Sequence, residues 1–139
     1  MDKSLNYLSL ARKAGFAELG EEPVGAAARE GHAYLILVAK DASDHTWRRA
    51  KSFAAGTEQQ CVRHPATKDE MGMAIGRESL AIAAITDPAL ALALVKSLPE
   101  TAQTKAALEV LSQKAQRQKQ RQKEQKAHQR NRRSGMKKK

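Results

Sequence analysis

The chain of 139 residues has a single cysteine, Cys61, so no disulfide bond can form within it. Its longest apolar runs fall well short of the roughly 20 residues that a membrane-spanning helix needs. The N-terminal residues also lack the continuous apolar core of a signal peptide. These absences predict a cytoplasmic protein with no disulfide framework and no membrane partner.

Sequence motifs for catalysis and for metal binding are missing as well. The chain has no phosphate-binding glycine loop, no dinucleotide fingerprint and no nucleophile elbow. Its four histidines are scattered, and there is no cysteine pair to complete a metal site. Cys61 lies in a short apolar segment, where a buried and inert thiol is the expected state. We therefore expect no catalytic residue, no metal and no cofactor, and predict that the protein is not an enzyme.

Positive charge is concentrated near the C-terminus. Residues 113–139 contain twelve Lys or Arg side chains and one acid, Glu124, so this segment carries +11. Residues 1–112 contain thirteen basic and fourteen acidic side chains and carry −1. A dense run of positive charge is most stable against a polyanion, because each neutralised phosphate releases a condensed counterion. The segment has only three apolar side chains to anchor it in a membrane, which makes nucleic acid the first candidate partner.

Five helices are predicted from apolar side chains that recur at helical spacing and from the glycine or proline that ends each run. They lie near residues 3–14, 21–30, 44–55, 68–75 and 88–98. Thr67 and Glu70 have the spacing of a capping box, and Asp87 is a cap for the last of these helices. Asp41 and Ser43 are both candidate caps for the helix that follows them.

Strand patterns alternate with these helices. Residues 34–39 and 80–86 are apolar without polar alternation, which is typical of strands covered on both faces. Shorter strands are expected near residues 16–19 and 61–62. The alternation predicts an α/β fold, a three-layer α/β/α sandwich with residues 34–39 in the middle of its sheet.

The sequence predicts two parts, a folded domain of residues 1–100 and a basic Gln/Lys/Arg-rich tail of residues 101–139. Leu108 and Leu111 can continue a helix after Thr101, but the apolar stripe ends at Ser112. Beyond it, the tail cannot bury enough apolar surface to offset the entropy of ordering. A disordered chain and a frayed helix therefore both remain open for this segment.

Four segments together resemble a known family: Gly20-Glu21-Glu22, LILVAKDAS at residues 35–43, KDEMGMAIG at residues 68–76 and AAITD at residues 83–87. Over residues 3–98 the chain resembles the kink-turn-binding ribosomal proteins, the archaeal L-seven-Ae and eukaryotic L-thirty-e superfamily, and especially its short bacterial members. The resemblance implies a three-layer sandwich with an RNA surface made by the start of the second helix, the loop after the central strand and the turn after the fourth helix. In this chain the implied RNA-binding residues are Gly20, Glu21, Glu22, Lys40, Asp41, Gly76, Arg77 and Ser79.

Each part of this implied surface has a physical rationale. A helix N-terminus presents unpaired amide donors to phosphates or base edges, and Lys40 and Arg77 supply positive charge. In the tail, Arg130, Arg132 and Arg133 are the expected phosphate contacts. The basic side chains of Arg48, Arg49 and Lys51 either form a solvated helix face or contact the RNA backbone, and the sequence leaves both alternatives open. The acids Glu21 and Glu22 complement the dipole of the helix that they begin, a simpler interpretation than acid/base catalysis.

The second helix departs from the family pattern. Kink-turn binders begin it with glycine, any residue, asparagine and glutamate, followed later by a lysine. This chain has Glu22, Pro23 and Ala26 at the last three positions. The side chains of Pro23 and Ala26 form no hydrogen bonds, so the familiar contacts to sheared G·A pairs are not available. The turn at residues 77–79 is also more polar than the apolar loop of strict kink-turn readers.

The leading hypothesis is a non-catalytic, ribosome-associated protein that reads structured RNA by shape and uses its tail for phosphate affinity. Its expected partner is ribosomal RNA, and a monomer is expected outside the ribonucleoprotein. One alternative is a protein-interaction or stress-adaptor module with a solubilising tail. Another is an accessory domain of an RNA methyltransferase, although the chain has no room for a catalytic domain.

Overall fold

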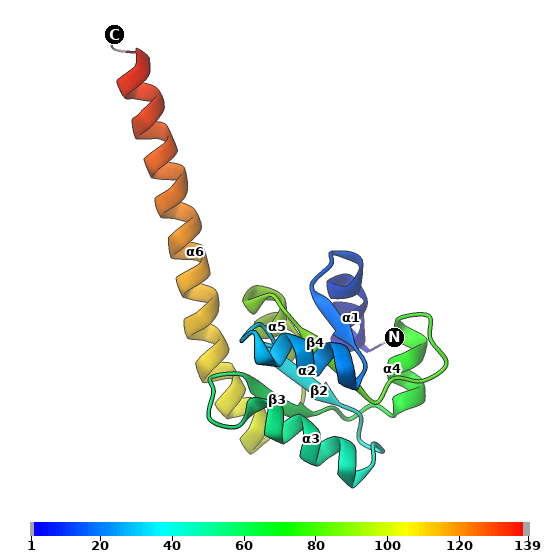
Figure 1. The fold of residues 1–139 in the computed structure, drawn as a ribbon. Helices are drawn as coiled ribbons and strands as arrows, with labels where there is room; N and C mark the ends of the chain where they lie inside the picture. Colours follow the sequence, from blue (N-terminus) through cyan, green and yellow to red (C-terminus); the bar gives the residue numbers. More distant parts are fainter. Residues whose placement is uncertain (1, 138–139) are drawn as a thin grey trace.

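The computed structural model describes the backbone of residues 2–137 and the side chains of residues 2–129 (Figure 1). The predicted alternation of helices and strands is confirmed, with a sixth helix after it. The helices are α1 Lys3–Lys13, α2 Glu21–Arg29, α3 Asp44–Ala54, α4 Lys68–Ala74, α5 Pro88–Lys96 and α6 Ala102–Lys137. The strands are β1 Ala17–Leu19, β2 Leu35–Val38, β3 Gln60–Arg63 and β4 Ile82–Ile85.

The four strands form one mixed sheet in the order β1-β4-β2-β3. β2 pairs with β3 in parallel and with β4 in antiparallel orientation, so Leu35 lies opposite both Gln60 and Ile85. β1 pairs with β4 in antiparallel orientation. The predicted position of residues 34–39 inside the sheet is therefore confirmed, and every β2 residue is buried as that position requires.

Alternate residues of the two inner strands enter two different cores because successive side chains of a strand point to opposite faces. On one face, Leu35 and Leu37 pack with buried side chains of α1, α4, α5 and α6. On the other face, Ile36 and Val38 pack with buried side chains of α2 and α3. The predicted α/β/α sandwich is confirmed, with helices on both faces of the sheet (Figure 1).

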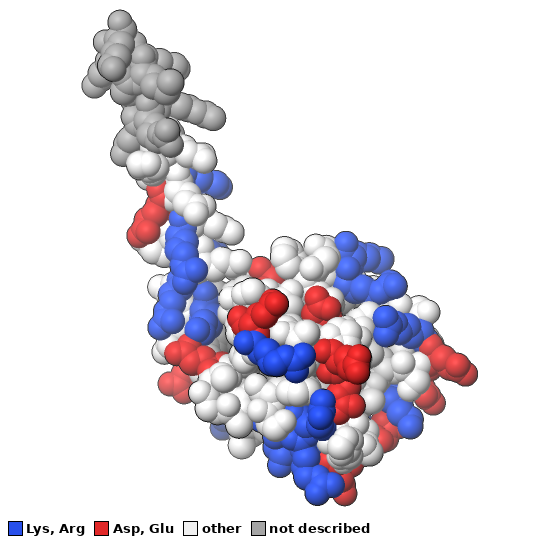
Figure 2. All heavy atoms as spheres, in the orientation of Figure 1, with Lys and Arg blue, Asp and Glu red and all other residues white. Residues whose placement is uncertain are grey.

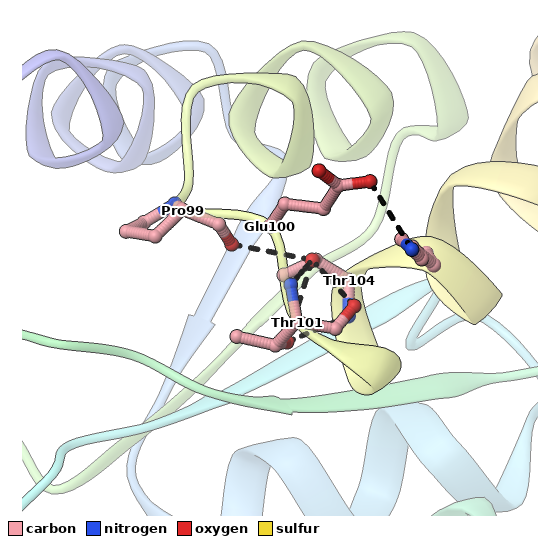
Figure 3. A network of polar contacts seen from close by, with 5 residues as sticks. Pro99, Glu100, Thr101 and Thr104 are labelled. Atoms are coloured by element: carbon pink, nitrogen blue, oxygen red, sulfur yellow. Dashed lines mark hydrogen bonds and ion pairs between the residues drawn. The ribbon is translucent and has the colours of Figure 1, made fainter.

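Helix α6 begins at a pair of threonines that cap each other's backbone (Figure 3). The Thr101 hydroxyl oxygen accepts from the Thr104 amide at 3.1 Å, and the Thr104 hydroxyl oxygen accepts from the Thr101 amide at 2.7 Å. Ala107 and Leu111, further along the helix, are fully buried in the larger core. The hydrophobic core thus continues past residue 100, where the sequence predicts the end of the folded domain.

Beyond Leu111, two polar contacts hold α6 against the body. Lys114 forms an ion pair with Glu58, in the segment between α3 and β3. The Gln118 amide donates to Asp87 Oδ1 at 2.9 Å, at the corner between β4 and α5. After these contacts the helix extends away from the body (Figure 1), so of the two forms left open for the tail, the structure describes the helical one. No helix in the described part of the chain has an apolar stretch long enough to cross a membrane.

A buried hydrogen-bond chain connects α1 to the segment after β3. His64, only 1% exposed, lies with Nε2 at 2.7 Å from the Ser4 hydroxyl, and its Nδ1 accepts from the Ala66 amide at 2.9 Å. Because Nδ1 is an acceptor, the ring proton belongs on Nε2 and is donated to Ser4. The Ser4 hydroxyl in turn donates to Asp2 Oδ1 at 2.5 Å. With a neutral imidazole, each polar group in this series of hydrogen bonds has a partner.

This arrangement predicts acid sensitivity. Burial lowers the pKa of His64 below its ordinary value of about 6.5, more than the nearby Asp2 and Glu70 raise it. As the pH falls below about 6.5, the unfolded chain binds a proton that the folded protein does not, so the free energy of unfolding decreases. Urea unfolding measured between pH 7.5 and pH 5 should show this slope, and His64→Gln should reduce it. The exposed His32, replaced by glutamine, is the control, and an unchanged slope in His64→Gln would contradict the assignment.

Candidate nucleic-acid interface

The three segments that the family resemblance assigns to RNA binding lie at the same end of the sheet. The Gly20 amide donates to the Ile82 carbonyl at 3.0 Å, which places the start of α2 beside the start of β4. The Ala39 amide donates to the Ala81 carbonyl at 2.9 Å, which places the loop after β2 beside the turn before β4. The start of α2, the β2–α3 loop and the α4–β4 turn therefore form one surface, which we name the three-loop face.

The α4–β4 turn is held rigidly against its own helix. Gly76 has a φ of +72°, and the Arg77 amide donates to the Gly72 carbonyl at 2.8 Å, the bonding pattern of a Schellman cap. Gly72 lets the turn pass directly over α4, because a Cβ atom at Gly72 would lie 2.7 Å from the backbone of Ser79. Arg77 and Ser79 are exposed on this fixed turn.

Asp41 has a structural role that corrects one prediction. Its Oδ1 accepts from the Lys68 amide at 2.8 Å, so it binds the first amide of α4, whose N-cap is Thr67, and does not cap the helix that follows it in sequence. The other candidate, Ser43, is the cap of α3 and accepts from the Thr46 amide at 3.2 Å. The Asp41 contact ties the β2–α3 loop to α4, and Lys40 next to it remains exposed.

The start of α2 is open to a ligand. Its N-cap is Gly20, which has no side chain to bond the first amides of the helix. Glu21 Oε1 lies 2.9 Å from Arg49 Nε, and this ion pair connects α2 to α3. That oxygen has no hydrogen-bond partner of good geometry among the described residues. Glu21 is thus engaged within the protein, whereas Glu22 beside it is exposed.

The three-loop face carries little attraction for a polyanion. Its segments, residues 20–24, 40–43 and 76–79, contain four acidic and two basic side chains and so have a net charge of −2. Long-range attraction to RNA would have to come from another part of the protein, because a net negative face repels phosphates at a distance.

Basic side chains follow α6 from the body outward (Figure 2). This helix starts near the three-loop end, where the Gln103 side chain accepts from the Arg63 amide at 3.0 Å at the end of β3. It leaves the body at the other end of the sheet, since Asp87, which binds Gln118, comes shortly after the last residue of β4. The three-loop face and the point where α6 leaves the body therefore lie at opposite ends of the sheet, a separation that the sequence does not reveal. The side chains of Arg130, Arg132 and Arg133 lie outside the described residues.

The basic side chains of α3 contact aromatic rings of their own neighbourhood. Arg49 lies 5.3 Å from the centre of the Phe53 ring, and Lys51 lies 5.5 Å from the Trp47 ring. Arg63, on β3, lies 4.9 Å from the same Trp47 ring. These cation–π contacts give the basic side chains partners within the protein, which favours the interpretation of this helix face as a solvated surface.

The single cysteine, Cys61, has the buried thiol that the sequence predicts. Burial raises the pKa of the Cys61 thiol to about 12, despite the positive charges of Lys51 and Arg63 nearby. The thiol thus stays protonated at neutral pH, as its apolar surroundings predict.

The aromatic side chains near α6 are functional candidates that sequence reasoning missed. Phe16 is 41% exposed, and both Phe16 and Tyr34 line a groove beside the basic residues Arg117 and Arg121. Phe16 follows a glycine, and in sequence it looks like an ordinary strand residue. A large exposed aromatic side chain can only be noticed once the fold is known.

Comparisons with known proteins support the fold. No protein-family model matches the chain, and a search of curated proteins found no match. Among solved structures, a protein of unknown function from Bacillus halodurans C is 27% identical, with a TM-score of 0.65 over 72% of this chain and 100% of that one. The Giardia lamblia 15.5kD RNA binding protein is 15% identical, with a TM-score of 0.53 over 78% of this chain and 82% of that one. The chain is similar to both in the arrangement of its α/β/α sandwich.

Proposed function

We propose that this protein is a non-catalytic RNA-binding protein of the cytoplasm, a divergent relative of the kink-turn-binding superfamily that associates with ribosomal RNA. The observation that carries the proposal is the convergence of three loops at one end of the sheet, around the uncapped start of α2. The similar fold of the Giardia RNA-binding protein adds support. A concave or bent RNA backbone is a ligand that loops on such a rigid scaffold can fit by shape.

Recognition at the three-loop face would rest on a few short contacts. The first amides of α2 can donate to phosphate oxygens or base edges, and Lys40 and Arg77 can each neutralise a phosphate. Pro23 and Ala26 contribute no polar side-chain contact. The target is therefore a shape that presents phosphates to this face, and not the set of sheared base pairs read by strict kink-turn binders.

Helix α6 would supply most of the affinity. As an α-helix of 36 residues it is about 54 Å long, and twelve of the 25 basic side chains of the protein follow position 112. Because it leaves the body at the end opposite the three-loop face, one RNA touching both must span the body. A large folded RNA such as ribosomal RNA meets this requirement better than a short hairpin.

A double substitution tests the three-loop face. Lys40→Ala with Arg77→Ala in the full chain should weaken binding to a structured ribosomal RNA fragment by about ten- to hundredfold, since each change removes a charge-assisted contact. Binding to an unstructured homopolymer should change little. The charge-matched control is Lys51→Ala with Lys96→Ala, on α3 and α5. Filter binding at fixed salt measures the RNA affinity of both double variants. Equal losses of affinity in the two would show that the three-loop face is not the binding site.

Crosslinking in cells, followed by sequencing of the bound RNA, tests the identity of the partner. Recovery of ribosomal RNA fragments with a folded, bent backbone is the expected outcome. Recovery of a protein partner without RNA would favour the adaptor alternative, and the RNA proposal would be abandoned.

A further inference from the structure

A groove lies where α6 leaves the body, at the end of the sheet opposite the three-loop face. It has a volume of about 280 Å³ and is lined by Phe16, Tyr34 and Thr86 on the body and by Lys114, Arg117 and Arg121 on α6. Two neighbouring depressions share Tyr34 with it, so this ring lies where the three meet. Two aromatic rings and three cations therefore line one continuous hollow.

The two rings are carried by fixed backbone. The Phe16 amide donates to the Ala11 carbonyl, and its carbonyl accepts from the Thr86 amide, both at 2.8 Å. The Tyr34 carbonyl accepts from the Gln60 amide at 3.1 Å. Phe16 is nevertheless 41% exposed, whereas most large apolar side chains of the body are buried. An exposed ring on a fixed backbone can stack on a ligand at a lower cost in conformational entropy than a ring on a mobile loop.

The cations belong to one face of α6. Positions 114, 117 and 121 are three, four and seven residues apart, the spacing that aligns side chains along a helix. Lys114 is neutralised by Glu58, but Arg117 and Arg121 form no ion pair with any residue whose side chain is described. The one acid of the groove is Asp87, and its two oxygens already accept from Gln118 and from the Leu90 amide. The groove thus keeps two guanidinium groups that form no close ion pair with a described side chain, beside two rings and the single carboxylate of Asp87.

We propose that this groove is a second RNA site, which binds an unpaired nucleotide of a single strand. The base stacks on Phe16 or Tyr34, and Arg117 and Arg121 contact the adjacent phosphates. Every base has a π face that an aromatic ring can bind, and guanidinium groups bind phosphates in fixed geometry, so the combination suits single strands of any sequence. The site goes beyond the shape recognition proposed for the three-loop face, because it requires bases and not only a phosphate backbone.

The first test separates stacking from charge. The full chain is titrated at low salt with an oligoadenylate of about twelve nucleotides and with an abasic oligonucleotide of the same length. Phe16→Leu with Tyr34→Leu should weaken oligoadenylate binding by about tenfold or more while leaving abasic binding unchanged. Phe16→Leu alone, at an exposed position, should give part of the loss even if the double variant is unstable. Met73→Ala, at an exposed apolar residue of α4, is the control.

The second test uses the two faces of α6. Arg117→Gln with Arg121→Gln should weaken binding of both oligonucleotides more than Lys123→Gln with Lys126→Gln, which removes equal charge from the opposite face. Equal losses in these two variants, or unchanged oligoadenylate affinity in Phe16→Leu, would overturn the groove as a site. Neither readout depends on Lys40 and Arg77, so this proposal and the proposed function can fail separately.

Discussion

A chain truncated after Lys119 is expected to lose about a thousandfold or more of its RNA affinity near 50 mM salt. The truncation removes nine of the twelve basic residues found after position 112. Each phosphate contact contributes about 0.7 to 0.9 to the slope of log K against log salt, and six or more contacts correspond to at least about 10³ in affinity between 50 and 200 mM salt. The three-loop face, with a net charge of −2, cannot replace this attraction.

The structure shows where this cut should be made. Leu111 belongs to the core and Gln118 binds Asp87, so truncation nearer the body would remove contacts that hold the fold together. Cutting after Lys119 keeps them all, and thermal unfolding of the truncated protein should match that of the full chain. Binding is followed over a salt series with a ribosomal RNA fragment. A full-length chain with the same nine basic residues changed to glutamine is the control for length. An unchanged salt slope in both proteins would show that α6 does not contribute to RNA binding.

Gly72→Ala is expected to destabilise the protein by about 1–3 kcal/mol, the usual cost of overpacking. The added Cβ would lie 2.7 Å from Ser79 Cα and 2.9 Å from the Arg77 carbonyl oxygen, both of them backbone atoms that cannot rotate aside. The turn must therefore move away from α4, and Arg77 moves with it. The variant should lose affinity for structured RNA even at temperatures where it remains folded.

Two neighbouring residues supply matched controls for Gly72. Met73 is 75% exposed, so Met73→Ala should change the free energy of unfolding by less than about 0.5 kcal/mol. Gly76 has open space around it but a φ of +72°, so Gly76→Ala should cost about 1–2 kcal/mol through backbone strain alone. Urea unfolding compares the three variants. A Gly72→Ala protein as stable as Met73→Ala would show that the close approach of the turn is not needed.

Local signals allowed much of the fold to be predicted. The capping box of Thr67 and Glu70 and the cap at Asp87 are present with the expected hydrogen bonds. Such caps join atoms only three residues apart, so the sequence around them is enough to specify them. The apolar runs at residues 34–39 and 80–86 likewise indicated inner strands, because only a strand covered on both faces has no polar alternation.

Contacts between distant segments could not be predicted in this way. Both Asp41 and Ser43 fit the pattern of a cap for α3, and only the packed structure shows Asp41 bonded to Lys68, 27 residues away. His64 and Ser4 are separated by 60 residues, and nothing in the sequence pairs them. The close approach of Ser79 to Gly72 is likewise defined by the path of the turn and not by the residues around Gly72.

The sequence by itself determined that a nearly neutral α/β body is joined to a strongly basic segment, because composition and hydrophobic periodicity are properties of the chain alone. The tertiary structure decided where these parts lie. It gathered three loops at one end of the sheet and placed the point where α6 leaves the body at the other end, beside Phe16 and Tyr34. Strand order and direction set these positions, and they depend on how buried surfaces fit together across the whole domain.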